Sequence, residues 1–453
     1  MAGINDGLTE IREARQDLDA VIRDIQQLPE FRNFLAPPRF EDLATAADRE
    51  PLVYVVPADL GGVALVVRGD DTTAVDLPGL TSAAVREQAD RFQRALRVRG
   101  ARDDDLGFVD ELDELAERYA VEEGADDRVG DRVWAAMLTD LTGWLWRVAI
   151  GAVVREVRPA PGAVLVAGGL LGLMPLHAAW TEDRDAPTGR HYALDDLTLS
   201  YAPNARALTA GRARATGGSD RLVAVTDPSP HPLPFARLEA ATVAAGFGGS
   251  GGVLPPAQTT PAEVLTALRG ADVALFSCHA TADLTAPLDS GLRLASGGDD
   301  DDGVLRLRNL LAENLNLRLA VLSACETSLP GTGFPDEVVA LPTGLLQAGV
   351  RGVIASLWPV PDQATCRLTV EFFRRFRHEN QSPATALRGA QRWLRDTTNA
   401  EKIAHYEAAL DAGADWLPEP TGEVFLELLY AKNPTCRADA ALNTWAAFTH
   451  IGV

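Results

Sequence analysis

The pattern of apolar and polar positions predicts buried strands that alternate with helices over most of the chain. Short runs of branched apolar residues, bounded by turn signals, are typical of buried strands in a parallel sheet. Such runs occur at 164–167, 197–202, 222–226, 273–278, 319–324 and 352–358. Helical periodicity is found at about 236–246, 261–269, 336–347, 361–377, 383–397 and 401–431. This alternation predicts an α/β fold with a mostly parallel sheet flanked by helices.

The first 150 residues follow a different pattern. Apolar residues spaced by three, four and seven positions form the narrow seam of an amphipathic helix: Ile4, Leu8, Ile11, Leu18, Ile22 and Ile25. Strand-like runs separated by turn residues predict an antiparallel meander at 52–56, 63–67 and 74–77. We expect helices to follow at about 81–98, 108–122 and 130–149.

These changes of pattern divide the chain into three parts. We assign 1–50 to an N-terminal amphipathic helical segment, 51–150 to the meander and its helices, and 151–453 to the main α/β domain. The helical seam is suited to docking on its own domain or to continuing a helical array. Because the chain begins on this seam, we expect that it could be a piece of a longer protein.

Composition and charge narrow the function classes. The chain has 46% apolar and 23% charged residues, which is typical of a soluble globular protein. No apolar run approaches the ~20 residues that span a bilayer. A net charge of −22 argues against a nucleic-acid partner, which requires a basic footprint. The N-terminus lacks a secretory signal and the four cysteines form no CxxC pair, so we expect a reducing, cytoplasmic location without membrane association.

Three features that could suggest ligand binding have simpler structural interpretations. The glycine cluster at 168–172 lacks the spacing of a phosphate loop, so a tight turn is expected. The aspartates at 299–302 are adjacent rather than alternating, which predicts a solvated hairpin tip and not a calcium loop. His177 stands alone in an apolar setting and is typical of a structural histidine. We therefore expect neither a metal nor a cofactor.

The strongest chemical signal is a histidine and a cysteine at the ends of two predicted strands. His279 follows the run at 273–278, and Cys325 follows the run at 319–324, 46 positions later (325 − 279). Sites in open α/β sheets lie beyond the carboxyl ends of strands, so the two residues could meet there. A cysteine nucleophile and its base require such an encounter. The backbone N–H groups of Ala280 and Cys325 are candidate donors to an oxyanion.

A structural interpretation of the same residues stays open. A buried cysteine after an apolar strand is usually an inert small hydrophobe. We expect Cys278, one residue before His279, to be of this inert kind. The pattern alone does not decide between the catalytic and the structural interpretation of Cys325.

Several motifs resemble those of the CHAT family of caspase-like cysteine peptidases, which are relatives of separase. His279 lies in ALFSCHA (274–280), Cys325 lies in LAVLSACETS (319–328), and AGVRGVIASLWPVPD follows at 348–362. Further similar segments are GLLGLMPLHAAW (169–180) with YAPN (201–204), ALRGAQ (386–391) and NTWAAF (443–448). The resemblance covers about 150–453 well and 50–150 loosely. It implies a caspase-like fold and a Cys325–His279 dyad that cleaves protein substrates without a cofactor.

Two positions qualify this resemblance. The family usually has glycine after the histidine, where this chain has Ala280; the backbone N–H survives the change. In separase-like relatives, an acidic residue after the Leu-Trp strand faces a basic P1 side chain, and Asp362 matches that segment. We therefore hypothesise a preference for Arg or Lys at P1. The alternative is that Asp362 only caps the following helix.

The resemblance favours a regulated cysteine endopeptidase, of the kind that often acts as a switched effector in microbial defence or signalling. A helical-repeat region or a partner protein could regulate it through the N-terminal seam. One alternative is a catalytically silent scaffold that binds partners. Another is a hydrolase of a different amide, such as an isopeptidase or a transpeptidase.

Overall fold

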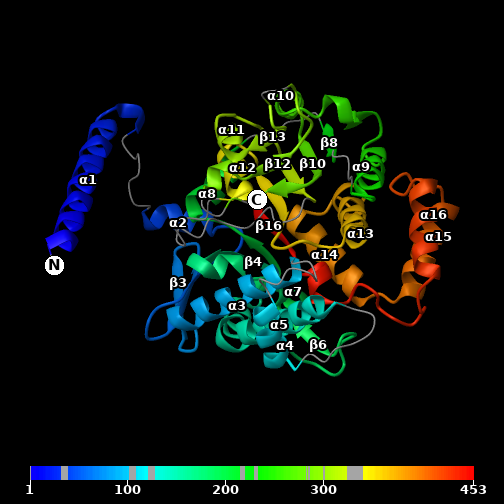
Figure 1. The fold of residues 1–453 in the computed structure, drawn as a ribbon, viewed down its shortest axis with the longest axis horizontal. Helices are drawn as coiled ribbons and strands as arrows, with labels where there is room; N and C mark the ends of the chain where they lie inside the picture. The colour runs from blue at the N-terminus through cyan, green and yellow to red at the C-terminus, as the bar shows by residue number, and fades with distance from the viewer. Residues whose placement is uncertain are drawn as a thin grey trace.

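The fold is built on one large sheet. A computed structural model describes residues 2–31, 39–100, 109–120, 128–214, 220–228, 233–281, 283, 286–298, 301–323 and 340–453. In this part of the chain, eleven strands form a single sheet that is flanked by helices (Figure 1). The predicted α/β class with its mostly parallel sheet and N-terminal meander is confirmed.

The strands follow one another across the sheet in an order that departs from their order in sequence. From one edge to the other they are β3 (Asp71–Leu77), β2 (Gly62–Arg68), β1 (Leu52–Val56), β4 (Gly162–Ala167), β7 (Thr198–Tyr201), β16 (Phe448–Gly452), β15 (Gly352–Ser356), β14 (Leu319–Leu322), β10 (Val273–Ser277), β8 (Leu222–Thr226) and β9 (Gly251–Val253). Because β1 pairs with β4, the sheet continues across residue 150.

Apart from β2, which pairs antiparallel with β1 and β3, the sheet consists of two halves that run in opposite directions. β1, β4, β7 and β16 are parallel to one another, and so are β15, β14, β10, β8 and β9. β15 and β16 pair antiparallel at the centre. The carboxyl ends of β8, β10, β14 and β15 therefore share one edge of the sheet. The carboxyl ends of β4 and β7 lie at the opposite edge.

The central junction requires a residue without a side chain at Gly352. A Cβ at this position would lie 2.6 Å from the carbonyl oxygen of Val453 and 2.9 Å from Nε2 of His450. Distances of this size are too short for any Cβ contact, so only glycine lets the last strand approach β15.

The two faces of the sheet are covered by different helices. One core includes side chains of α3 (Ser82–Gly100), α5 (Val129–Leu145), α9 (Ala236–Ala245), α13 (Asp362–Phe373) and α14 (Pro383–Asp396). The other includes side chains of α10 (Pro261–Leu268), α11 (Leu307–Leu311) and α12 (Leu341–Gln347). β10 contributes Val273 and Leu275 to the first core, and Ala274 and Phe276 to the second. This alternation explains why β10 is apolar throughout.

Shorter elements complete the chain. They are η1 (Pro29–Phe31), α2 (Phe40–Ala46), α4 (Val109–Arg118), η3 (Trp146–Ile150), α6 (Gly151–Val157), η4 (Gly169–Leu173), η5 (Leu176–Ala178), β5 (Trp180–Glu182), β6 (Arg190–Tyr192), α7 (Ala193–Asp196), α8 (Ala205–Ala213), η6 (Gly248–Ser250), η7 (Pro256–Gln258), β11 (Ala280–Thr281), η8 (Pro287–Asp289), β12 (Gly291–Arg293), β13 (Val304–Arg306), η9 (Arg374–His378) and α17 (Leu442–Trp445). β12 and β13 pair antiparallel; of the aspartates predicted at the hairpin tip between them, Asp301 and Asp302 are described, and Asp299 and Asp300 lie outside the described residues.

Two predicted elements differ from the structure. The helical stretch expected over 401–431 is a pair, α15 (Asn399–Asp411) and α16 (Glu419–Tyr430), which separates near Gly413 with its φ of +60°. The sequence pattern predicts only a short final element at 445–448, where the structure has the strand β16 (Phe448–Gly452). Its residues Thr449, His450 and Gly452 break the apolar run that identifies the other central strands.

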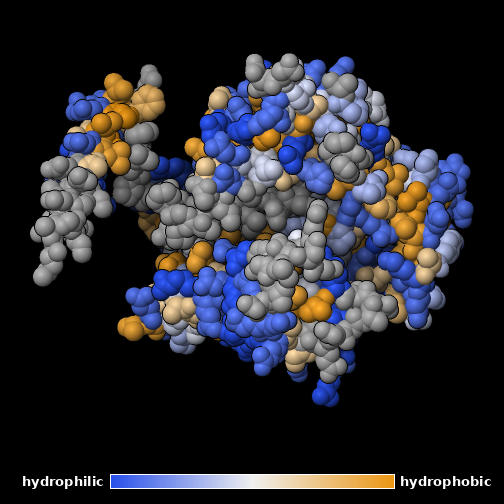
Figure 2. Space-filling view, viewed as in Figure 1, coloured by the Kyte–Doolittle hydropathy of each residue, from blue (hydrophilic) through white to orange (hydrophobic). Residues whose placement is uncertain are grey.

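Helix α1 (Ala2–Gln26) lies apart from the sheet domain (Figure 1). Its side chains Leu18 and Val21 are exposed, as are Leu28 and Phe31 just after the helix. Apolar surface gathers over this part of the molecule (Figure 2). Of the seam residues whose side chains are described, Leu18 is exposed and Ile22 and Ile25 are half-buried. The two predicted uses of the seam, docking and helical repeats, stay predictions.

One helical stretch among the described residues, Val129–Val157, is long and apolar enough to cross a membrane by length and composition alone. However, 61% of its most apolar window is buried inside the protein. Trp134, Met137 and Leu141 of this stretch belong to the main core. Such burial is typical of a core helix, which passes the same test as a membrane span.

The fold makes a prediction for Trp358, which follows β15. Its ring packs against Phe92 and Trp134, with centroids 6.1 Å and 5.6 Å away, and its indole N–H donates to Asn443 O at 3.0 Å. Trp358→Ala should lower the free energy of unfolding by about 3–5 kcal/mol. Trp358→Phe, which loses only the N–H bond and some packing, should cost less. Urea unfolding measures both.

The control is Leu60→Ala, because Leu60 is 99% exposed. This change should stay within about 0.5 kcal/mol of the parent protein. An equal loss for Leu60→Ala and Trp358→Ala would contradict the role of the aromatic cluster.

Candidate active site

His279 emerges from the sheet at the shared carboxyl edge. All five residues of β10 are buried, and the chain then leaves the sheet through Cys278 and His279 into β11. The His279 carbonyl accepts the N–H of Arg293 at 2.8 Å, and Ala280 pairs with Leu292 of β12. The imidazole is 40% exposed. The small sheet of β11, β12 and β13 thus fixes the backbone while the ring stays accessible to solvent.

The second predicted residue, Cys325, lies outside the described residues, so its position is not described. The strand before it, β14, pairs with β10 in parallel, with Phe276 opposite Leu322. Ser323 N donates to Phe276 O at 2.9 Å and extends this pairing by one bond. In sequence, His279 and Cys325 each come three residues after the pair Phe276–Leu322. The strand register is therefore compatible with the predicted dyad.

The structure adds a buried carboxylate that was not among the predicted site residues. Asp227 follows β8, the strand on the other side of β10, and its side chain is fully buried. One of its oxygens, Oδ2, lies 3.6 Å from Nε2 of His279 and accepts the N–H of Leu233 at 3.1 Å. A carboxylate at this distance stabilises the protonated imidazole. The carboxyl-end rule that identified His279 also applies to Asp227, which directly follows the run 222–226.

Asp362 approaches the same place from α13. Its Oδ2 accepts the N–H of Phe235 at 2.7 Å, and so ties the start of α13 to the segment before α9. Partial burial raises the pKa of Asp362, while the Phe235 N–H and the charge of His279 oppose that shift. Asp362 is the first residue of α13 and not its N-cap, which is Pro361. The contact with Phe235 therefore distinguishes it from a simple helix cap.

A second carboxyl that sequence analysis missed lies beneath the strand ends. Glu239 of α9 is fully buried, and its Oε2 accepts the hydroxyl of Ser323 at 3.0 Å. Burial raises its pKa to about 8, opposed by hydrogen bonding to Ser323 and Ser277, while the nearby negative charge of Asp362 raises it further. Glu239 is therefore neutral at neutral pH. A glutamate in a short helix carries no sequence signal of such burial.

The other cysteines differ in exposure. Cys278 and Cys366 are buried, and burial raises the pKa of both thiols. Thiols in this state are poor nucleophiles, which agrees with the inert role expected of Cys278. Cys436 is exposed.

The remaining candidates from the sequence are structural. His177 is buried, its Nδ1 lies 2.9 Å from the hydroxyl of Tyr201, and burial lowers its pKa to about 4. Neutral at ordinary pH, it holds the ends of η5 and β7 together. Among the described residues, no group of three or more His, Cys, Asp or Glu side chains could hold a metal ion.

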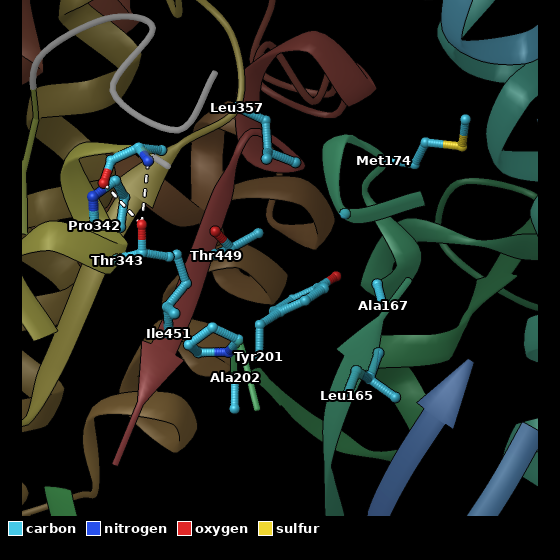
Figure 3. A pocket seen from close by; sticks show the side chains of 13 residues that line it. Leu165, Ala167, Met174, Tyr201, Ala202, Pro342, Thr343, Leu357, Thr449 and Ile451 are labelled. Carbon is cyan, nitrogen blue, oxygen red and sulfur yellow. Dashed lines mark hydrogen bonds between the residues drawn. The ribbon is translucent and has the colours of Figure 1, made fainter. Parts of the chain in front are cut away.

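A small apolar cavity of about 80 Å³ lies elsewhere (Figure 3). Tyr201 of β7, Thr449 and Ile451 of β16, and Thr343 of α12 line it, where the two halves of the sheet join. The cavity is not lined by His279, Asp227 or Asp362. It therefore belongs to the junction and not to the candidate site.

The strand order of the sheet, with His279 just after β10, places the protein in a fold class. It has a caspase-like peptidase fold. The CHAT domain model matches residues 139–453. Since this is more than half of the chain, the protein belongs to the CHAT-domain family.

Solved structures of separase share the fold of this chain. Separase, in the Saccharomyces cerevisiae separase–securin complex, aligns with a TM-score of 0.50 at 10% identity over 91% of this chain and 30% of that chain. The pro- and mature domains of Porphyromonas gingivalis RgpB align with a TM-score of 0.36 at 10% identity, over 77% and 76% of the two chains. This chain thus spans about a third of the separase chain. A search of the curated proteins finds no match.

Burial of Glu239 predicts how stability changes with pH. Its pKa is raised from 4.5 to about 8 in the folded protein, so between these values the folded state holds a proton that the unfolded state has lost. Stability must therefore fall as the pH rises through this window. Glu239→Gln removes the titrating group, so its free energy of unfolding should not fall in this way. The difference in free energy of unfolding between the two proteins should therefore grow by up to about 4 kcal/mol, in favour of the variant, from pH ~5 to pH ~8.

Thermal unfolding of the two proteins across this range measures the effect. The exposed Glu423→Gln is the matched control, and it should not reproduce the trend. A constant difference between the parent and Glu239→Gln at all pH values would contradict a neutral buried carboxyl.

Proposed function

We propose that the protein is a regulated cysteine endopeptidase that acts through Cys325 and His279. The observation that carries this proposal is the parallel pairing of β10 with β14, with Phe276 opposite Leu322. Both proposed catalytic residues follow this pair by three positions, at the edge of the sheet where α/β sites form. Membership of the CHAT family supports the same assignment.

In the proposed reaction, the Cys325 thiolate attacks the carbonyl carbon of the scissile amide and forms a carbon–sulfur bond. The tetrahedral oxyanion accepts hydrogen bonds from the backbone N–H groups of Ala280 and Cys325. The carbon–nitrogen bond breaks as the His279 imidazolium gives its proton to the leaving amine. His279 then takes a proton from water, whose oxygen attacks the acyl carbon and releases Cys325 as a thiolate.

Asp227 has a defined part in this proposal. Its buried carboxylate lies 3.6 Å from Nε2 of His279 and is held by the N–H of Leu233. A fixed negative charge at this position stabilises the imidazolium that pairs with the Cys325 thiolate. We therefore assign Asp227 as the residue that orients His279.

The carboxylates around His279 also support a preference for a basic P1 residue. Asp362 lies near enough to His279 and Asp227 for the charges of both to affect its pKa. A P1 guanidinium or ammonium that enters this region would meet the half-buried carboxylate of Asp362. Since Oδ2 of Asp362 already accepts the Phe235 N–H, Asp362 acts mainly through its charge.

The regulatory part of the proposal concerns α1. Its exposed Leu18 and Val21 lie outside the sheet domain, where they can join a helical-repeat region or a partner protein. Regulation of this kind fits a switched effector in microbial defence or signalling. The four widely spaced cysteines, which form no CxxC pair, favour a reducing, cytoplasmic location.

The dyad predicts a loss of cleavage in two variants. Cys325→Ala and His279→Ala should each lower kcat/KM by about 10³-fold or more. The assay uses a library of fluorogenic peptides and a panel of folded proteins. Cys436→Ser, which removes an exposed thiol, is the matched control and should retain full activity.

Other outcomes decide between the alternatives. Unchanged cleavage by Cys325→Ala would exclude this dyad. Binding of a panel protein without cleavage by the parent would favour a silent scaffold. Cleavage limited to side-chain-linked amides would favour an isopeptidase.

The acidic surroundings predict separate effects of two further variants. Asp362→Asn keeps the acceptor for Phe235, and should lower kcat/KM for peptides with Arg at P1 by about 10–100-fold while sparing those with Leu at P1. Asp227→Asn should slow both kinds of peptide, because it acts through His279. Cleavage profiling that shows apolar P1 residues in the parent protein would overturn the basic preference.

A further inference from the structure

A second, larger cavity lies at the edge of the sheet opposite to the candidate active site. It has a volume of about 620 Å³ and adjoins the carboxyl ends of β4 and β7. Residues of α8 line one side of it, and residues of α12 line another. Cavities of this size hold small-molecule ligands, and sites in α/β sheets form beyond the carboxyl ends of strands. The half of the sheet without His279 therefore has a cavity at its own carboxyl edge.

The face of α8 that borders the cavity carries small residues between two arginines. Ala207, Ala210 and Gly211 line the cavity along the helix, with Arg206 in its first turn and Arg214 directly after its last residue. Residues three or four positions apart share one face of a helix. With a rise of about 1.5 Å per residue, the backbones of Arg206 and Arg214 lie about 12 Å apart along the helix. The cavity therefore extends along most of α8, with a cation at each end.

The lining is positively charged, although the protein as a whole has a net charge of −22. Among the described lining residues, Arg206 and Arg214 carry a charge and none is acidic. In the described part of the chain no carboxylate pairs with Arg214, whereas Arg212 on the same helix pairs with Asp48 at 3.2 Å. The charge of Arg214 is therefore available to an anion that enters the cavity.

More positive charge lies behind the wall of the cavity. Nε of Arg351 donates to the carbonyl oxygen of Gly211, a lining residue, at 3.1 Å. Burial lowers the pKa of Arg351, and the positive charges of Arg318 and Arg49 lower it further. These like charges repel one another, although Arg318 also has a carboxylate partner, Asp220, at 3.3 Å. An anion in the cavity would offset this repulsion.

Arg214 has a defined place at one end of the cavity, because it packs on the turn after α12. A Cβ at Gly349 would lie 2.5 Å from Nη1 of Arg214 and 1.8 Å from the carbonyl oxygen of Leu315. Gly349 also has a φ of +112°, which favours glycine. The next residue, Val350, lines the cavity. The guanidinium therefore lies against the backbone at the end of α12, next to the cavity.

The other end of the cavity adjoins the small apolar cavity at the junction of the two sheet halves. Ala167, Pro203 and Thr343 line both cavities (Figure 3). Thr343 lies in the first turn of α12, whereas Val350 follows its last turn. The larger cavity thus has a charged end near Arg214 and an apolar extension near Thr343.

We propose that this cavity is a binding site for a small organic phosphate of about nucleotide size. The phosphates bind at Arg214, and the apolar part of the ligand extends toward Thr343 and the smaller cavity. A phosphate group carries about −1.5 to −2 charges at pH 7, more than one carboxylate, and the planar fork of arginine matches its oxygens. The site lies at the opposite edge of the sheet from His279, so this inference is independent of the proposed peptidase function.

Titration calorimetry with ATP tests the site, because ATP joins three phosphates to an aromatic base. At ~50 mM salt without divalent metal ions, ATP should bind the parent protein with a Kd of about 0.1 mM or less, and adenosine should bind about 10-fold or more weakly. Arg214→Gln should weaken ATP binding by about 10–100-fold, since it removes a charge-assisted hydrogen bond. Arg155→Gln removes an exposed arginine of α6 as the matched control, and should leave binding unchanged.

A second pair of variants tests the position of the ligand without changing any charge. Ala210→Trp places a large ring in the cavity and should abolish ATP binding. Ala213→Trp is the matched control, because Ala213 is exposed on the same helix but does not line the cavity. Thermal unfolding shows which variants are folded at the temperature of the titration.

Three results would overturn the proposal. The first is neither a heat of binding nor a rise in Tm with ATP or pyrophosphate at up to ~5 mM. The second is ATP binding that Arg214→Gln and Ala210→Trp both leave unchanged, which would place the phosphates elsewhere on the protein. The third is binding of citrate without binding of ATP or pyrophosphate, which would assign the cavity to carboxylate ligands.

Discussion

The parallel pairing of β10 with β14 is the constraint on which the candidate site depends. Phe276 lies opposite Leu322, so the two strands reach the same edge of the sheet in register. The neighbours follow from this pair, because β8 adds Asp227 on one side and β15 leads through Trp358 to Asp362 on the other. Residues from four segments of the chain thereby converge on one edge, although more than 130 positions separate the first from the last (362 − 227 = 135).

The reversal of direction at the centre of the sheet confines this site to one half. β16 pairs antiparallel with β15, so β4 and β7 present their carboxyl ends at the opposite edge. Two parallel halves covered by common helices give a large core. The candidate site lies at one edge only, formed by the carboxyl ends of β8, β10, β14 and β15. Trp358, packed on Trp134 and Phe92, attaches the segment before α13 to helices α3 and α5. The acidic side of the site is thereby anchored in the main core.

Burial gives three carboxyl groups near the site different properties. Asp227 is fully buried, and its Oδ2 lies 3.6 Å from Nε2 of His279. Glu239 is also buried and accepts the hydroxyl of Ser323, and burial raises its pKa to about 8. Asp362, the first residue of α13, is half-buried and accepts the N–H of Phe235. The same chemical group thus differs in burial and in hydrogen-bond partners at three positions near the strand ends, and these surroundings decide its ionisation.

Sequence patterns predicted the parts of this arrangement that depend on local periodicity. The buried strands, the meander and His279 follow from apolar runs and from the position of a polar residue directly after one of them. The sequence did not predict β16 as a strand, because it contains the polar residues Thr449 and His450. A central strand with polar residues has the same pattern as a terminal tail. His279 was identified because it directly follows a buried apolar run, and the same rule also identifies Asp227. No such rule identifies Glu239, because only tertiary packing buries this helical glutamate and places it against Ser323.

Covalent trapping tests the proposed dyad most directly. A peptidyl-arginine acyloxymethyl ketone alkylates a thiolate that an imidazolium activates, and mass spectrometry of the digested protein identifies the modified residue. The expected result is a single adduct on Cys325, formed rapidly in the parent protein and largely lost in His279→Ala. Modification of exposed Cys436 instead, or equal labelling of Cys325 with and without His279, would contradict the dyad.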